Sequence, residues 1–310
     1  MCPSLLLHMI MRLINVLLLC FSFCVLINAQ QKEDYVWILG DQPGFTGLRF
    51  DFNKTPFEAE ERFFGLDMDQ NNASICDDNG NLLFYTNGCA VANMDHEIME
   101  NGDSINAGFF FDQLWLGDCE NGYPGRQDIM VLPDPSNGNG YYIIHKTVEY
   151  DTNLDPSLFL KYLKYSYVNL GVNNGKGKVA VKNVVFYDGV PLSSYLTAIT
   201  HTNGNDYWII QPETTNNSFL VFLLDSTGIN LVHELDLGLD FHPMYSSAAG
   251  DSKFSPDGKK YGYYNKTDGF WLFDFDRTTG ILENPNVLNQ EMVDGPLFST
   301  MEFSSNSEFV

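Results

Sequence analysis

Short apolar runs alternate with tight polar turns along most of the chain. At 253–264, Asp257-Gly258 separates two such runs. The same arrangement of run, turn and run recurs at 73–85, 128–144 and 196–210. Asn-Gly and Asp-Gly between apolar runs are strong signals for hairpins, because both central residues can adopt left-handed conformations. The pattern therefore predicts a series of β-hairpins.

The hairpins lead into further strands and repeat along the chain. A third apolar run follows three of them, at 158–167, 219–224 and 270–275. The turn glycines recur about every 60 residues, somewhat longer than the ~40–50 residues typical of a propeller blade. Residues 301–310 begin another copy and end inside it. The sequence predicts an all-β fold: a β-propeller-like array of about five four-stranded antiparallel blades, incomplete at the C-terminus.

The N-terminal segment differs from the rest. Residues 1–29 contain no Asp or Glu, and Arg12 precedes an apolar run at 13–27 that ends in Asn28-Ala29. A basic flank, a short apolar run and a small final residue are typical of a secretory signal peptide, and the run is too short to span a membrane comfortably. We therefore expect cleavage after Ala29, no membrane insertion afterwards, and a secreted or cell-surface propeller at 30–310.

Charge and composition narrow the class of partner. The 310 residues carry 40 acidic and 17 basic side chains, a net charge of −23. Such a surface repels phosphate backbones and anionic lipids, which excludes nucleic acid as a partner. Hydrophobic residues make up 44% of the chain, so we expect a packed core rather than disorder.

Cysteine positions permit one internal disulfide. Cys76, Cys89 and Cys119 remain after removal of the signal segment, and an odd number leaves at least one unpaired. Cys76 lies beside the turn at 77–80, and pairing about that turn leaves Cys89 beyond its reach. Cys89–Cys119 is therefore the favoured pair, and three unpaired core cysteines are the alternative.

One acidic segment resembles part of a calcium loop. Asp67, Asp69 and Asn71 alternate as oxygen ligands, and Asp78 falls at the twelfth position. The sixth position, Asn72, is not the Gly that an EF-hand requires, and a terminal Asp is a poorer bidentate ligand than Glu. These four residues are the candidate calcium ligands, and a solvated acidic loop is the alternative.

No linear catalytic motif is present. His96-Glu97-Ile-Met-Glu100 lacks the second His of a HExxH zinc site, and the chain has no G-x-S-x-G, Walker A or G-x-G-x-x-G segment. We therefore assign no catalytic residue and no cofactor from the sequence. Dispersed residues that converge at the centre of a propeller remain compatible with catalysis, because linear motifs do not reveal them.

The order of several motifs resembles one protein family. The segments 77–88, 93–102 and 127–133 occur in series, followed by Ser255-Pro-Asp-Gly-Lys and the segment 273–280. This series is similar to the N-terminal propeller region of large Bacteroidetes surface proteins that carry a gliding-motility-associated, type IX secretion sorting domain at the C-terminus. That sorting domain does not occur in this sequence. The resemblance implies an exported, non-enzymatic cell-surface component.

Two functional hypotheses follow. The leading one is a non-enzymatic binding or adhesion module of a gliding- or secretion-associated multidomain protein, with a protein or glycan at the cell surface as its partner. The alternative is a secreted carbohydrate-active hydrolase or lyase on a propeller scaffold. Two acidic residues that converge on one site would favour the hydrolase, because glycoside hydrolysis uses a pair of carboxyl groups.

Overall fold

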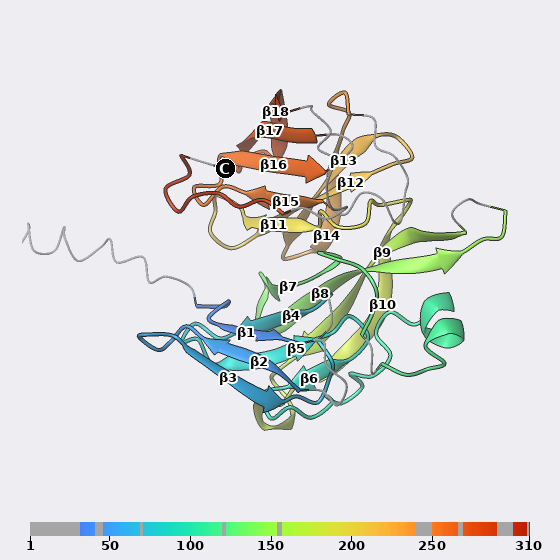
Figure 1. Cartoon of the computed structure of the whole chain (residues 1–310), viewed down its shortest axis with the longest axis vertical. Helices are drawn as coiled ribbons and strands as arrows, with labels where there is room; N and C mark the ends of the chain where they lie inside the picture. The colour runs from blue at the N-terminus through green and yellow to red at the C-terminus, as the bar shows by residue number, and fades with distance from the viewer. Residues whose placement is uncertain are drawn as a thin grey trace, which may run out of the picture. The chain divides into compact units, whose positions relative to one another are not determined.

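The computed structural model describes residues 32–40, 46–68, 71–119, 122–153, 157–239, 250–265, 269–289, 300–308 and 310 (Figure 1). The predicted signal peptide at 1–29 lies outside these residues. Residues Glu33–Val310 form one compact unit. Among the described residues, no helix is both long and apolar enough to cross a membrane.

The regular secondary structure of the described chain is almost entirely β-strand, arranged in five small antiparallel sheets (Figure 1). The first two sheets have three strands each: β1 (Val36–Leu39), β2 (Thr46–Asp51) and β3 (Glu58–Phe63), then β4 (Ala73–Cys76), β5 (Leu82–Thr86) and β6 (Val91–Asn93). The third contains β7 (Ile129–Asp134), β8 (Asn137–Tyr150), β9 (Leu158–Asn169) and β10 (Lys178–Asp188). The fourth contains β11 (Thr197–Thr200), β12 (Tyr207–Glu213), β13 (Ser218–Asp225) and β14 (Gly228–Leu235). The fifth contains β15 (Asp251–Phe254), β16 (Lys260–Asn265), β17 (Gly269–Asp276) and β18 (Ile281–Asn289).

Within every sheet, strands that follow one another in the chain are hydrogen-bonded neighbours. All four predicted hairpins form, as β4–β5, β7–β8, β11–β12 and β15–β16. Their turn chemistry explains why: Asp77 Oδ1 accepts hydrogen bonds from the backbone N–H groups of Asn79 and Asn81, and Gly80 has φ +84°. The prediction of an all-β chain of small antiparallel sheets is confirmed.

Consecutive sheets share apolar cores. Val36 and Ile38 of the first sheet belong to the same buried cluster as Cys76 and Tyr85 of the second. The rings of Phe84 and Tyr141 join the second and third sheets, with centroids 5.5 Å apart. Ile144 and Phe222 share the cluster between the third and fourth sheets, and Phe219 lies 5.2 Å from Phe273 between the fourth and fifth. The sheets therefore pack face to face in chain order.

The structure departs from the repeat pattern in three places. The first sheet, β1–β3, has no counterpart in the predicted series, because β3 is exposed along its length and its sequence Glu-Ala-Glu-Glu-Arg-Phe shows no apolar alternation. The second sheet lacks a fourth strand, and an irregular segment at 94–128 follows β6, containing one short helix, η1 (Phe110–Leu114). Residues 300–308 contain no strand, although Met301 and Phe303 are buried.

Several ionisable side chains are buried in or beside the third sheet. Lys146 Nζ lies 2.6 Å from Asp128 Oδ1, and both side chains are inaccessible to solvent or nearly so. The adjacent His145 is also fully buried, with Nε2 3.2 Å from Ser166 Oγ. Buried charges and imidazoles are rare unless paired, so these groups dominate the stability predictions in the Discussion.

Candidate functional site

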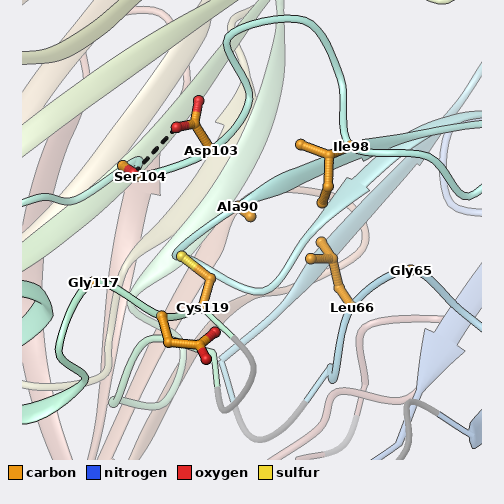
Figure 2. Close-up of a pocket in the computed structure, with 9 residues that line it drawn as sticks. Gly65, Leu66, Ala90, Ile98, Asp103, Ser104, Gly117 and Cys119 are labelled. Carbon is orange, nitrogen blue, oxygen red and sulfur yellow. Dashed lines mark hydrogen bonds between the residues drawn. The ribbon is translucent and has the colours of Figure 1, made fainter.

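A cavity of about 270 Å³ opens beside the irregular segment that follows β6 (Figure 2). It is lined by Gly65, Leu66, Ala90, Ile98, Asp103, Ser104, Gly117, Asp118 and Cys119. Two acidic residues, Asp103 and Asp118, therefore line one cavity. The remaining lining is small or apolar, apart from the Ser104 hydroxyl and the sulfur of Cys119.

Asp103 has a defined polar environment. Ser104 Oγ donates to Asp103 Oδ2 over 3.4 Å, the contact drawn in Figure 2. Lys182 Nζ lies 3.5 Å from Asp103 Oδ1 and donates to the backbone oxygen of Asp103 over 2.9 Å. The Asp103 side chain is 71% exposed. A carboxylate so placed is open to water and to a small substrate while Lys182 restrains it.

The backbone around the cavity is unusual. Asn101, Ser104, Asn106 and Leu116 all have positive φ between 54° and 66°. A non-glycine residue in this region costs free energy and persists only where surrounding contacts hold it. Here Asn101 Nδ2 donates to the Val179 oxygen over 2.7 Å, and Asn106 N donates to Asn183 Oδ1 over 2.6 Å. The cavity wall at 101–106 is thus held rigidly against β10.

The structure joins Cys89 to Cys119, the pair favoured from the sequence, with their Cα atoms 5.4 Å apart. Cys119 lines the cavity and Cys89 is fully buried. Cys76 is unpaired and buried, and burial raises the pKa of its thiol to about 11. Cys76 is therefore a protonated core residue rather than a reactive thiolate.

Two of the four candidate calcium ligands, Asn71 and Asp78, lie apart in the structure. Asn71 is buried and its Oδ1 accepts a hydrogen bond from Asp128 N, whereas Asp78 is exposed in the turn after β4. The four residues of β4 separate them by about 13 Å of extended chain at ~3.3 Å per residue, far beyond the reach of one ion. Asp69 lies outside the described residues, and Asp67 precedes it. Within the described ranges, no three His, Cys, Asp or Glu side chains could hold a metal ion together.

A hydrogen-bonded Tyr–His pair lies next to the cavity. Gly65 N donates to Tyr85 Oη over 3.3 Å, and Tyr85 Oη lies 3.1 Å from His96 Nδ1. The Tyr85 hydroxyl therefore links the backbone of Gly65 to the His96 ring. Burial, reinforced by Arg62 and Arg49, lowers the pKa of His96. The sequence analysis assigned His96 no catalytic role, and its contacts here support the Gly65 wall.

A second, larger cavity of about 390 Å³ lies against the first strands of three sheets. Its lining comprises Gln127, Met130, Leu132, Leu196, Thr197, Ala198, Ser252, Lys253 and Phe254. The Gln127 side chain in its wall already has hydrogen-bond partners: Nε2 donates to the Ser252 oxygen, and Oε1 accepts from Tyr195 N. Lys253 pairs with Glu302 over 2.8 Å. This cavity offers no pair of free carboxylates.

The sequence analysis missed Asp103 and Asp118. No linear motif contains them, but the length of the segment at 94–128 was an available signal. Irregular connections longer than about 12–15 residues are uncommon in compact domains and are usually functional or disordered. Its described residues 94–119 are held by Asn101, Asn106 and the disulfide, which favours function.

Comparisons with known proteins give structural neighbours only. No protein-family model and no curated protein matches the chain. A functionally unknown protein from Desulfotomaculum acetoxidans matches with a TM-score of 0.41 and 9% identity, covering 81% of this chain and 66% of that one. A periplasmic gluconolactonase from Pseudomonas aeruginosa matches with a TM-score of 0.34 and 12% identity, and the match covers 82% of this chain and 84% of that one. A putative 6-phosphogluconolactonase from Bacteroides fragilis matches with a TM-score of 0.38 and 13% identity, and the match covers 89% of this chain and 86% of that one.

The named neighbours correct one expectation from the sequence. Two of the three solved structures are lactonases by name, which contradicts the prediction of a non-enzymatic adhesion module and of a chain without enzymatic activity. We withdraw that prediction; the alternative of a hydrolase is nearer to these neighbours. At TM-scores below 0.5, no substrate and no residue role is transferred from them. The function must be argued from the cavity itself.

Proposed function

We propose that the chain is a hydrolase for a small sugar-derived substrate and that the cavity of Figure 2 is its active site. The observation that carries the proposal is that two acidic residues, Asp103 and Asp118, line one cavity. Enzymes that hydrolyse sugar derivatives by acid–base catalysis commonly use a pair of carboxyl groups on either side of the reacting carbon.

The two carboxyl groups can take different roles in the reaction, one at the attacking water and one at the leaving oxygen. An ionised carboxylate accepts a proton from water as that water attacks the acyl or anomeric carbon, and the second carboxyl group acts on the leaving oxygen. Lys182 Nζ, 3.5 Å from Asp103 Oδ1, orients this carboxyl group, to which we assign the role of base. The cavity volume of about 270 Å³ lies near the lower end of small-molecule sites, which favours a single sugar-sized ring.

The first test is hydrolysis by the purified chain. Sugar lactones and aryl glycosides cover the acyl and glycosyl classes of substrate, and turnover is measured above the spontaneous rate. We expect Asp103→Asn and Asp118→Asn each to lower kcat/KM by about 10²–10⁴-fold, the usual loss on removal of a general acid or base.

A matched control lies in the same segment. Asp112 is exposed on η1 and does not line the cavity, so Asp112→Asn should retain full activity. Equal activity of all three variants, or no turnover of either substrate class by the folded wild-type chain, contradicts the proposal.

We further propose that the five sheets are blades of a β-propeller and that the protein is exported. Face-to-face packing of consecutive sheets in chain order supports the first point. The apolar run at 13–27 supports the second. N-terminal sequencing of the protein secreted by its host tests export, and a chain that retains residues 1–29 contradicts it.

A further inference from the structure

The outer face of the first sheet carries large apolar side chains although it is exposed to solvent. In β1, Ile38 is buried against the second sheet, so its neighbours Trp37 and Leu39 point to the opposite face. Strand β2 continues this face, because Phe50 lies opposite Trp37 and Leu48 lies opposite Leu39. The face therefore has an aromatic row and an aliphatic row side by side.

Aromatic rings extend this face beyond the ends of the strands. The ring of Phe52 lies 5.0 Å from that of Trp37 and 5.5 Å from that of Phe57, measured between centroids. Phe57 in turn lies 6.2 Å from Phe50. These contacts join six residues into one surface, the first-sheet patch: Trp37, Leu39, Leu48, Phe50, Phe52 and Phe57. None of them belongs to a buried apolar cluster of the part of the chain that the structure describes.

The first-sheet patch is large enough for an interface between proteins. Trp37, Leu39, Leu48 and Phe57 are each between 42% and 54% exposed. At roughly 150–250 Å² for a large apolar side chain, they present about 400 Å² of apolar surface to water. Two such patches in contact would bury about 800 Å², and at the ~65% apolar share of homodimer interfaces this corresponds to about 1,200 Å² in total. Specific interfaces begin at about that size.

The chemistry of the patch fits another sheet face better than a sugar or a membrane. On β3, Ala59 lies opposite Phe50 and Glu61 lies opposite Leu48. Among the described strand positions of this face, Glu61 is the only ionisable residue, so a sugar would find few hydrogen-bonding groups. The net charge of −23 disfavours an anionic membrane. Each contact between consecutive sheets of the chain already joins two apolar faces, and the patch offers one more face of that kind.

We propose that the first-sheet patch is the interface of a homodimer, in which the patches of two copies pack face to face about a twofold axis. A twofold contact uses the same surface on both copies, so this surface must complement itself. An axis between the two rows places the row of Trp37 and Phe50 over the row of Leu39 and Leu48 in the other copy. Both rows then leave water. The inference does not depend on the proposed hydrolase activity.

The charge of the chain gives the dimer a characteristic response to salt. Each copy carries a net charge of −23, so two copies repel each other in dilute buffer. Salt screens exposed charges, with a Debye length that falls from about 10 Å at 0.1 M to about 3 Å at 1 M. It leaves the apolar contact in place. We therefore expect the dimer to become tighter as the salt concentration rises.

The test is sedimentation equilibrium on the full chain and its variants. We expect wild type to dimerise with a Kd in the micromolar range, as suits an interface at the small end of the size range. Leu48→Glu should raise the Kd at least about 10-fold, because it buries an unpaired carboxylate in each copy. Leu231→Glu on β14 is the matched control: Leu231 is 46% exposed and Leu48 45%, and the variant adds the same charge. Its Kd should equal that of wild type.

A second variant protects the test against a folding defect. Phe57→Ser removes a ring of the patch outside the strands and should raise the Kd in the same direction. Urea unfolding of each variant shows whether the chain remains folded, and a folded Phe57→Ser protein decides the test if Leu48→Glu does not fold.

Four outcomes overturn the inference. The first is a wild-type chain that stays monomeric up to about 1 mM in high salt. The second is an equal Kd for wild type, Leu48→Glu and Phe57→Ser, which places the contact elsewhere. The third is a dimer that weakens as salt is added, which shows an ionic interface. The fourth is a monomer that binds phosphatidylcholine vesicles or a soluble oligosaccharide and loses this binding in Leu48→Glu, which assigns the patch to a lipid or a sugar.

Discussion

Replacing Asp128 with alanine is expected to lower the free energy of unfolding by about 3–5 kcal/mol, the usual cost of leaving a buried charge without its partner. Lys146 Nζ donates to three acceptors, which are Asp128 Oδ1 at 2.6 Å, the Leu192 oxygen at 2.8 Å and the Ser194 oxygen. Three acceptors match the three N–H bonds of an ammonium group, so the buried lysine is charged. Burial lowers the pKa of Lys146, and the Asp128 carboxylate opposes this shift.

Asp128 also organises the connection between the third and fourth sheets. Its Oδ1 accepts a hydrogen bond from Ser194 N over 2.7 Å, and its Oδ2 accepts one from Ser193 Oγ over 3.3 Å. Ser194 and Tyr195 both have left-handed backbone conformations, with φ of 70° and 66°, so this connection requires outside support. Loss of the Asp128 carboxylate therefore removes the ion pair with Lys146 and also the hydrogen bonds that hold the strained segment at 193–195.

Urea unfolding at pH 7 measures the effect. Asp95→Ala is the matched control, because Asp95 pairs with Lys176 at an exposed site, where solvent screens the ion pair and its loss changes stability little. Adding Lys146→Met to Asp128→Ala should recover part of the loss, since the unpaired charge is then gone. A loss below about 1 kcal/mol in Asp128→Ala would contradict the assignment of a charged, buried pair.

The second large effect is a dependence of stability on pH caused by His145. Complete burial, with a further contribution from Lys164, lowers the pKa of His145 to about 3, against 6.5 for an ordinary histidine. Between these values the unfolded chain binds a proton that the folded chain does not. Stability is therefore fully present above pH 6.5 and declines by about 1.4 kcal/mol per pH unit as the pH falls toward 3.

His145→Gln removes this titration and should flatten the profile. Because the carboxyl groups of the chain titrate in both proteins, the difference between the two profiles isolates the histidine. At pH 4.5, two units below the ordinary histidine value, wild type should have lost about 2.7 kcal/mol more than the variant, relative to pH 7.5. Parallel urea-unfolding profiles from pH 7.5 to 4.5 would show that the imidazole is protonated in the folded chain.

The hairpins could be predicted because each one is determined by residues that are close together in the sequence. Ser255-Pro-Asp-Gly-Lys places a turn between two apolar runs, and in the structure Ser255 Oγ donates to Asp257 Oδ1 over 2.7 Å while Gly258 has φ +70°. The register of β15 and β16 then follows, with Phe254 opposite Tyr261 and Asp251 opposite Tyr264. Each of these features depends on residues a few positions apart.

The first sheet and the calcium candidate show where local information misleads. β3 pairs along its whole length with β2 although its side chains are exposed and largely charged, so neighbouring backbone rather than apolar alternation determines that strand. Asp67, Asp69, Asn71 and Asp78 have a ligand-like spacing along the sequence, but Asn71 and Asp78 lie apart in the structure. Strand β4 lies between Asn71 and Asp78, and its extended backbone separates the side-chain oxygens of these two residues.

The amino-acid sequence alone determined the β-class of the chain, its four hairpins and the cysteine pair most compatible with them, because turn chemistry and apolar alternation act over neighbouring residues. Three hairpins turn at Asn-Gly or Asp-Gly, whereas β7 and β8 are joined at 135–136 and the predicted turn residues Asn139 and Gly140 lie within β8. Only the tertiary structure decided which side chains share a site. Asp103 is positioned by β10 and Asp118 is restrained through Cys119, and these supports lie far away in the chain or across a disulfide. The same holds for Asp128 and Lys146, whose charges become costly only because the packing of successive sheets removes water from both.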